Sequence, residues 1–309
     1  MTLEQLFTKH RDLKWYFLRP GGNWGDHLIY AGAERLANDI GLNWENVTLE
    51  ELNEYDLDDK SCIYLHGSGG FNSWCSGQPF LDFKVAVGKN VFLVIQGPAT
   101  VEDNLGNIKS SMSSLELRIR CKSIIFFARE KVSFDILKKT FKDIDEASVA
   151  LDHDTALHLK LPDLLKLARL DAVPSEKYKL YVERKDQESA SDSAPYIGFG
   201  SVYMDPAVDA KSLSEWIAIH LCAKIIVTNR LHSAIVGTIA GKKVDISKGN
   251  YHKNFSVWEY SLKNRGVRWV DKTSNFSMIN MILPRRVRES YKVNQFFKHL
   301  HGVPGSNPE

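Results

Sequence analysis

The sequence lacks the patterns that would indicate a membrane, disulfide-rich or zinc protein. It holds only four cysteines, and no two of them form a Cys-x-x-Cys pair. A disulfide framework or a cysteine-based zinc site is therefore not expected. There is no apolar run of about 18 residues that could span a membrane. The first residues mix acidic and basic side chains, unlike a secretory signal peptide. We therefore expect reduced thiols in a cytoplasmic protein with no metal site.

The chain also lacks a large charge of either sign. Forty Lys and Arg residues against 38 Asp and Glu residues give a net charge of +2. Nucleic-acid binders usually carry a large basic excess, so nucleic acid is not expected as a partner. The sequence has no GxxxxGK[ST] phosphate loop, no HExxH zinc motif and no GxSxG nucleophile elbow. These absences argue against a P-loop NTPase, a zinc protease and an α/β-hydrolase.

What is present is a long series of short apolar runs alternating with helical patterns over 309 residues. Continuous apolar strands of this kind are typical of parallel sheets that are buried on both faces. Strands are predicted at 14–18, 62–65, 91–95, 123–127, 147–151, 178–182, 196–199, 224–227 and 243–246. Helices are predicted at 27–40, 111–120, 131–141, 164–170, 212–221, 233–240 and 284–300. The fold class is thus α/β, with two Rossmann-like lobes at 1–160 and 161–283 and a basic amphipathic helix and tail at 284–309.

Two glycine-rich loops follow predicted strands. GNWGD at residues 22–26 comes before a helix, where Asn23 and Gly25 could approach a ligand and the helix N-terminus could bind an anion. The simpler interpretation is a tight turn with Asp26 as the N-cap. HGSGG at residues 66–70 offers His66, Gly69 and Gly70 at a strand end, or forms a glycine loop that binds nothing.

Basic residues stand at other strand ends. Arg129 and Arg184 each end an apolar strand, and either one could form a surface salt bridge instead of a ligand contact. The sharpest motif is Arg230-Leu231-His232, which lies between a buried strand and a helix of small apolar residues. Asn250 and Lys253 follow the next strand in a polar loop. Asp152-His153-Asp154 superficially matches a metal-binding Asp-x-Asp triplet, which is common by chance.

These motifs, in this order over roughly residues 20–255, resemble the polysaccharide pyruvyltransferase family. The resemblance implies a fold similar to two-lobed GT-B glycosyltransferases, with the active site in the cleft between the lobes. It also implies transfer from phosphoenolpyruvate to two hydroxyls of one sugar, giving a cyclic ketal and phosphate. The matching donor positions are Arg129, Arg230, Leu231 and His232, and Asn23 and Asp26 match the first motif. The chain departs from the family pattern at Gly67-Ser68-Gly69-Gly70, usually three glycines, and at Asn229, often an aspartate.

The residue chemistry agrees with this donor, which carries a carboxylate and a phosphate. Arginines and backbone N–H groups suit both anions, and Lys253 adds a further positive charge. We assign His232 as the acid that protonates the methylene carbon, and Asp26 as the base or hydroxyl-orienting group. The acceptor side is assigned to Asn23, Gly25, His66, Gly69, Gly70 and Asn250.

No cofactor is predicted beyond the donor itself. The expected partners are phosphoenolpyruvate and a saccharide or lipid-linked oligosaccharide, and the acceptor sugar and oligomeric state are left open. The basic helix at 284–309 would favour peripheral association with an anionic surface, such as the inner membrane face. A nucleotide-sugar glycosyltransferase on the same fold is the alternative function, and a non-catalytic sensor that retains the fold is a further one.

Overall fold

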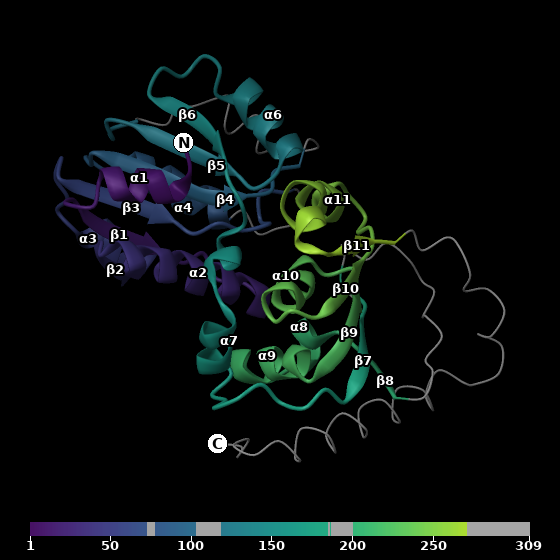
Figure 1. The fold of residues 1–309 in the computed structure, drawn as a ribbon. Coiled ribbons are helices and arrows are strands. Elements are labelled where there is room, and N and C mark those ends of the chain that lie inside the picture. Colours follow the sequence, from purple (N-terminus) through teal and green to yellow (C-terminus); the bar gives the residue numbers. More distant parts are fainter. Residues whose placement is uncertain (73–77, 103–118, 185, 187–199, 271–309) are drawn as a thin grey trace. The chain divides into compact units, whose positions relative to one another are not determined.

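The computed structural model describes residues 1–72, 78–102, 119–184, 186 and 200–270. The chain divides into two compact units, residues 1–158 and 159–309 (Figure 1). Each unit contains one parallel β-sheet with helices packed on it. The predicted α/β class with two Rossmann-like, parallel-sheet lobes is thereby confirmed.

The first unit is built on a six-stranded sheet with the order β2-β1-β3-β4-β5-β6. Every pairing in it is parallel. Its strands are β1 (Lys14–Leu18), β2 (Asn43–Val47), β3 (Ser61–Leu65), β4 (Leu93–Ala99), β5 (Ile124–Ala128) and β6 (Ala147–Leu151). All residues of β3, β4 and β5 are buried, as expected for central strands of a sheet that is covered on both faces.

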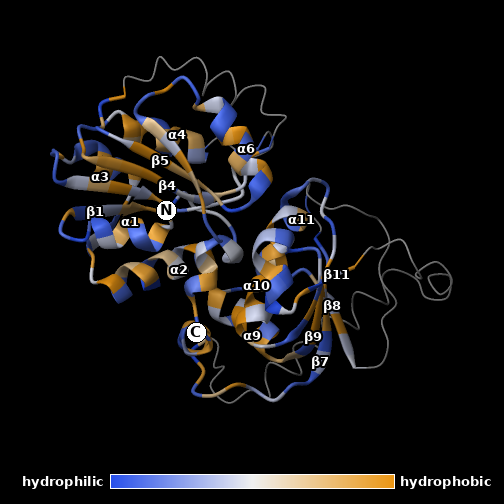
Figure 2. Cartoon of the chain, turned by 45° about the horizontal axis from the view of Figure 1, so that its top comes forward, coloured by the Kyte–Doolittle hydropathy of each residue, from blue (hydrophilic) through white to orange (hydrophobic). Residues whose placement is uncertain are grey.

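The two faces of this sheet belong to two separate hydrophobic clusters. Successive residues of a strand point to opposite faces, so Cys62 and Tyr64 join one cluster while Ile63 and Leu65 join the other. The first cluster is covered by α1 (Leu3–Lys9) and α2 (Trp24–Ile40), and the second by α3 (Leu49–Glu54), α4 (Gln78–Val87) and α6 (Lys131–Thr140). In Figure 2 the strands of this sheet are largely orange, while the helices carry both colours.

The second unit has a five-stranded parallel sheet with the order β11-β10-β9-β7-β8. Its strands are β7 (Tyr178–Val182), β8 (Ser201–Met204), β9 (Ala223–Thr228), β10 (Lys243–Ile246) and β11 (Arg268–Trp269). Its helices are α7 (Leu161–Leu167), α8 (Pro206–Asp209), α9 (Leu213–Leu221), α10 (Leu231–Ile239) and α11 (Lys253–Val257). Three short helical segments complete the described chain: η1 (Thr155–His158) in the first unit, and η2 (Trp258–Leu262) and η3 (Lys263–Arg265) in the second.

Both sheets follow one connection rule. In each, the first strand pairs with the second on one side and with the third on the other. The next strand is therefore added first on one side of β1 and then on the other, next to β3. The same change of side occurs at β7, between β8 and β9. Open α/β sheets bind ligands outside the carboxyl ends of the strands at such a switch point. Each unit thus has a defined place where a ligand would be expected.

Several elements differ from the sequence prediction. Strand β2 was not predicted, because Asn-Trp-Glu-Asn-Val at this sheet edge is mostly exposed and shows no apolar pattern. Strand β4 ends at Ala99 instead of Ile95, because the strand continues through Gly97 and Pro98 with a register shift. Helix α4 and strand β8 were also missed. The predicted strand at 196–199, the helix at 284–300 and nearly all of the helix at 111–120 lie outside the described residues.

Candidate functional site

The first glycine loop, between β1 and α2, holds Asp26 in a tight structure. Asn23 is the N-cap of α2, and its Oδ1 accepts from Gly25 N at 2.8 Å. Asp26 Oδ2 accepts from Asn23 N at 2.9 Å, which completes a capping box. Gly22 has φ +135°, and a Cβ there would lie 2.3 Å from Asp26 Oδ2, so only glycine permits this fold. The interpretation of Asp26 as the N-cap is wrong, because Asn23 holds that position.

The second glycine loop follows β3 and begins with a buried histidine. His66 is 1% exposed, and its ring packs against Tyr30 with 4.7 Å between ring centroids and against Tyr64 with 5.1 Å. Neither ring nitrogen has a hydrogen-bond partner in the described structure. Burial lowers the pKa of His66 well below its usual value, so this imidazole is neutral near pH 7. Backbone packing is tight here too, since a Cβ at Gly67 would lie 2.2 Å from Pro98 O.

These two loops flank the β1/β3 switch point, and the backbone joins them where His66 N donates to Leu18 O at 3.1 Å. Beside the first loop is a pocket of about 540 Å³. Hydrogen-bonding side chains predominate among the residues that line it: Leu18, Arg19, Pro20, Gly21, Asn46, Val47, Thr48, Leu49, Glu50, Glu51, Gln78 and Asp82. Burial raises the pKa of Asp82, whose Oδ1 accepts from Gln78 at 2.7 Å.

Arg129 follows β5 and is 1% exposed. Its Nη1 donates to Asp154 Oδ2 at 2.8 Å, and its Nε donates to Thr100 Oγ1 at 2.7 Å. The alternative of a surface salt bridge is therefore wrong, because this ion pair is buried.

Asp152 Oδ2 accepts from Leu3 N at 2.6 Å, so the acidic triplet supports local structure. Among the described residues no group of His, Cys, Asp or Glu is arranged to hold a metal ion.

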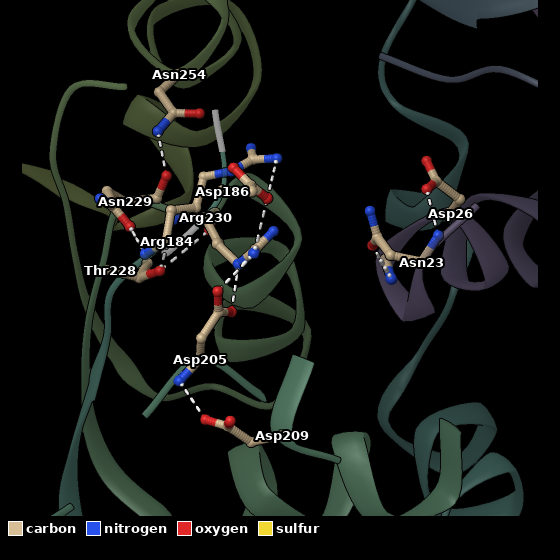
Figure 3. A network of polar contacts seen from close by, with 11 residues as sticks. Asn23, Asp26, Arg184, Asp186, Asp205, Asp209, Thr228, Asn229, Arg230 and Asn254 are labelled. Atoms are coloured by element: carbon tan, nitrogen blue, oxygen red, sulfur yellow. Dashed lines mark hydrogen bonds and ion pairs between the residues drawn. The ribbon is translucent and has the colours of Figure 1, made fainter. Parts of the chain in front are cut away.

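In the second unit, Arg230 lies between β9 and α10 and is held by acidic side chains (Figure 3). Its Nε and Nη2 donate to the two carboxylate oxygens of Asp205 at 2.5 and 2.6 Å. Nη2 also donates to Asp186 Oδ2 at 3.0 Å. The side chain of Asp205 is 0% exposed, whereas that of Asp186 is 41% exposed. Fork-to-fork pairing of this kind fixes the plane of a guanidinium.

A second arginine contacts the same exposed carboxylate. Arg184, which follows β7, donates from Nε to Asp186 Oδ1 at 2.7 Å and from Nη2 to Asp186 Oδ2 at 3.1 Å. Its backbone N donates to Asn229 Oδ1 at 2.8 Å. Because Arg184 follows β7 and Arg230 follows β9, the two guanidinium groups flank the switch point of the second sheet.

The remaining predicted residues of this unit lie along the same sheet edge. Leu231 is buried and His232 is half-buried in the first turn of α10. Lys253 begins α11, is 6% exposed, and places Nζ 5.1 Å from the centre of the Tyr251 ring. Asn254 Nδ2 donates to Asn229 O at 2.6 Å and to Ser247 O at 3.0 Å, which ties the loops after β9 and β10 together. Asn250 is exposed.

Asp186 and Asp205 contact the predicted arginines but were not predicted as functional residues from the sequence. Asp205 follows strand β8 and precedes Pro206, and an aspartate before a proline is a common start of a helix. That signal could have placed Asp205 at a strand end. Asp186 lies in a polar stretch without periodicity and gives no such signal. Elsewhere, Asn23, Gly25 and Asp26 lie together at the start of α2 in the first unit, while His66, Gly69 and Gly70 lie in the loop after β3.

Two parallel sheets of one strand order, each with polar loops at its switch point, define a two-unit α/β protein of the Rossmann type. The chain belongs to the polysaccharide pyruvyl transferase family, whose model matches residues 23–244. It is therefore a transferase of a family that acts on saccharides. No curated protein matches it.

Among solved structures, a functionally uncharacterised protein from Klebsiella pneumoniae subsp. pneumoniae NTUH-K2044 is similar, with a TM-score of 0.62 and 19% sequence identity. The match covers 87% of this chain and 96% of that chain, and it bears on the fold alone. In the part of the chain that the structure describes, no helix combines the length and apolarity needed to cross a bilayer.

Proposed function

We propose that the protein transfers the pyruvyl group of phosphoenolpyruvate to two hydroxyls of a sugar, forming a cyclic ketal and releasing phosphate. The observation that carries this proposal is the position of Arg230. It lies at a sheet switch point, its guanidinium plane is fixed by buried Asp205, and His232 follows two residues later at the start of α10. An arginine with a fixed orientation beside a helix N-terminus suits a small dianion or trianion.

The proposed reaction is an addition followed by a substitution at the same carbon, C2. His232 donates a proton to the methylene carbon while a sugar hydroxyl adds to C2, giving a tetrahedral phosphate ester. A second hydroxyl of the same sugar then bonds to C2 and gives its proton to His232, which restores the acid, and the C2–O bond to phosphate breaks. The arginines stabilise the charge of the departing phosphate. Asp26 accepts or orients the hydroxyl proton, and the side-chain oxygen that it leaves outside the capping box, Oδ1, is the atom available for this step.

We assign the acceptor to the first unit. The pocket of about 540 Å³ presents Arg19, Gln78 and Asp82 beside the first glycine loop, and such mixed donors and acceptors suit a polyhydroxylated ligand. The acceptor would be a polysaccharide or its lipid-linked precursor, which a cytoplasmic enzyme would meet at the inner membrane face. No cofactor is invoked, since the donor already carries the activated group.

The test is release of inorganic phosphate from phosphoenolpyruvate with a panel of glycans, followed by NMR of the product ketal. A donor present at about 100 times its Kd should stabilise the fold by about 2.7 kcal/mol. Stabilisation by nucleotide sugars but not by phosphoenolpyruvate would contradict the proposal and favour glycosyl transfer. Asp26→Asn should lower kcat, and an unchanged kcat would remove Asp26 from the mechanism.

A further inference from the structure

The exposed carboxylate of Asp186 lies between two arginines at the switch point of the second sheet. It accepts from Arg184 Nε at 2.7 Å and Nη2 at 3.1 Å, and from Arg230 Nη2 at 3.0 Å (Figure 3). A single carboxylate that bridges two guanidinium groups makes the contacts that a substrate carboxylate or phosphate would make. We propose that Arg184 is a second donor-binding arginine, and that Asp186 occupies the donor's anion position until phosphoenolpyruvate displaces it. This inference rests on the proposed function.

The two acidic partners of Arg230 differ in how they are held. Asp205 is 0% exposed, binds both Nε and Nη2 of Arg230, and its backbone N donates to Asp209 Oδ2 at 2.8 Å. Removing it would leave a guanidinium that is 8% exposed without its main partner. Asp186 has a side chain that is 41% exposed and holds Arg230 through Nη2 alone. Asp205 is therefore the positioning residue, and Asp186 is the one that a ligand can replace.

The backbone keeps the two arginines near each other when Asp186 leaves. Arg184 N donates to Asn229 Oδ1 at 2.8 Å, and Asn229 N donates to Val182 O at 3.3 Å. These contacts join the ends of β7 and β9 without using either guanidinium. The side chains of Arg184 and Arg230 are only 10% and 8% exposed, so packing limits their movement. The anion site is thus preformed, and Asp186 competes with the donor for it.

The competition predicts opposite effects for two neighbouring substitutions. Asp186→Asn removes the competing charge at nearly constant size, so phosphoenolpyruvate and inorganic phosphate should each bind about two- to fivefold more tightly. KM for the donor should fall while kcat stays within about twofold. Arg184→Gln removes a charged donor and should weaken binding of both anions by about 10- to 100-fold. In the double variant the gain from Asp186→Asn should shrink, because only the contact with Arg230 Nη2 remains to be released.

The experiment is titration calorimetry of the full chain with inorganic phosphate and with phosphoenolpyruvate, alongside the phosphate-release assay. Asp245→Asn is the matched control, since Asp245 receives Nε and Nη2 of Arg268 at 2.8 and 2.7 Å in the same unit. It should leave both Kd values unchanged. Melting curves confirm that each variant is folded.

Unchanged or weaker anion binding by folded Asp186→Asn overturns the inference, while wild-type phosphate release with phosphoenolpyruvate would leave the proposed function intact. Failure of wild type and Asp186→Asn alike to bind phosphoenolpyruvate overturns both. An equal gain in Asp245→Asn would show a general charge effect and would also overturn the inference.

Discussion

The helices that begin at the two switch points start in opposite ways. Helix α2 of the first unit is closed by a capping box, in which Asn23 and Asp26 use side-chain oxygens on backbone N–H groups. Helix α10 of the second unit has Arg230 at its N-cap and no side-chain cap hydrogen bond. A capped terminus has its N–H groups partly satisfied, whereas an uncapped one beside an arginine favours an anion.

The charged side chains at the two switch points also differ. Next to β3 lies His66, a neutral buried imidazole, and next to β1 lies Arg19, whose Nε donates to Glu34 Oε1 at 2.9 Å. Next to β7 and β9 lie Arg184 and Arg230, linked by Asp186. One strand order therefore supports two kinds of site. The difference supports an anionic donor at the second unit and an uncharged polyol at the first.

The largest expected effect is the loss of kcat when His232 is replaced, because His232 lies at the anionic site of the second unit and acts there as the proposed acid. His232→Gln should lower kcat by about 10²- to 10⁴-fold, because general acid catalysis contributes that much. Steady-state phosphate release measures the change. His153→Gln, a half-buried histidine of the first unit, is the control and should keep its turnover. Near-normal kcat in a folded His232→Gln variant would remove His232 as the acid.

The next effect compares the buried Arg–Asp pairs of the two units. Asp154→Ala leaves Arg129, 1% exposed, without its carboxylate and should cost about 3–5 kcal/mol of unfolding free energy. Asp205→Ala should cost less, because Asp186 still contacts Arg230. Urea denaturation measures both values.

The exposed pair on α2 is the reference for these two variants. The side chain of Asp39 is 52% exposed beside Arg35. Asp39→Ala should therefore cost no more than about 1 kcal/mol of unfolding free energy. A loss for Asp154→Ala no larger than that for Asp39→Ala would show that burial does not set the energy of the pair at Arg129.

The sequence predicts the sheets better than it predicts these acidic partners. Runs such as IIFFA in β5 are apolar throughout, because both faces of the strand are buried, and that pattern is local. Strand β2 escaped prediction because an exposed edge strand needs no apolar pattern. Arg230 and His232 were found because they follow a buried strand directly. Asp205 is 25 residues away from Arg230 and meets it only through the pairing of β7 with β8 and β9, which no local pattern encodes.

A smaller effect should appear in the pH dependence of stability. Burial lowers the pKa of His66 in the folded protein well below 6.5, its ordinary value in the unfolded chain. Between the folded-state and the unfolded-state pKa, the unfolded chain therefore binds more protons than the folded one. The unfolding free energy therefore falls as pH drops below about 6.5. This one group therefore contributes part of the loss of stability in acid. Urea titrations of wild type and His66→Phe at pH 7 and pH 5 measure its share.

Buried His220 in the second unit provides the comparison, since burial lowers its pKa to about 4. It contributes with the same sign over the window from about 6.5 to about 4. His66→Phe should therefore reduce the pH dependence without abolishing it. An unchanged slope in His66→Phe would mean that His66 is not neutral in the folded state.

The smallest effect concerns the capping box itself. Asn23→Ala removes the oxygen that accepts from Gly25 N and should cost about 1 kcal/mol of unfolding free energy, whereas Asn23→Gly should cost a few tenths. Ser212→Ala at α9 is the matched control in the second unit, because its Oγ accepts from Glu215 N at 3.1 Å. It should lose about as much as Asn23→Ala. Thermal or urea unfolding measures each loss. If Ser212→Ala is destabilised while Asn23→Ala is not, the start of α2 is not held by its cap. The two switch points would then differ in charge but not in how their helices begin, and an anion could be expected at either one.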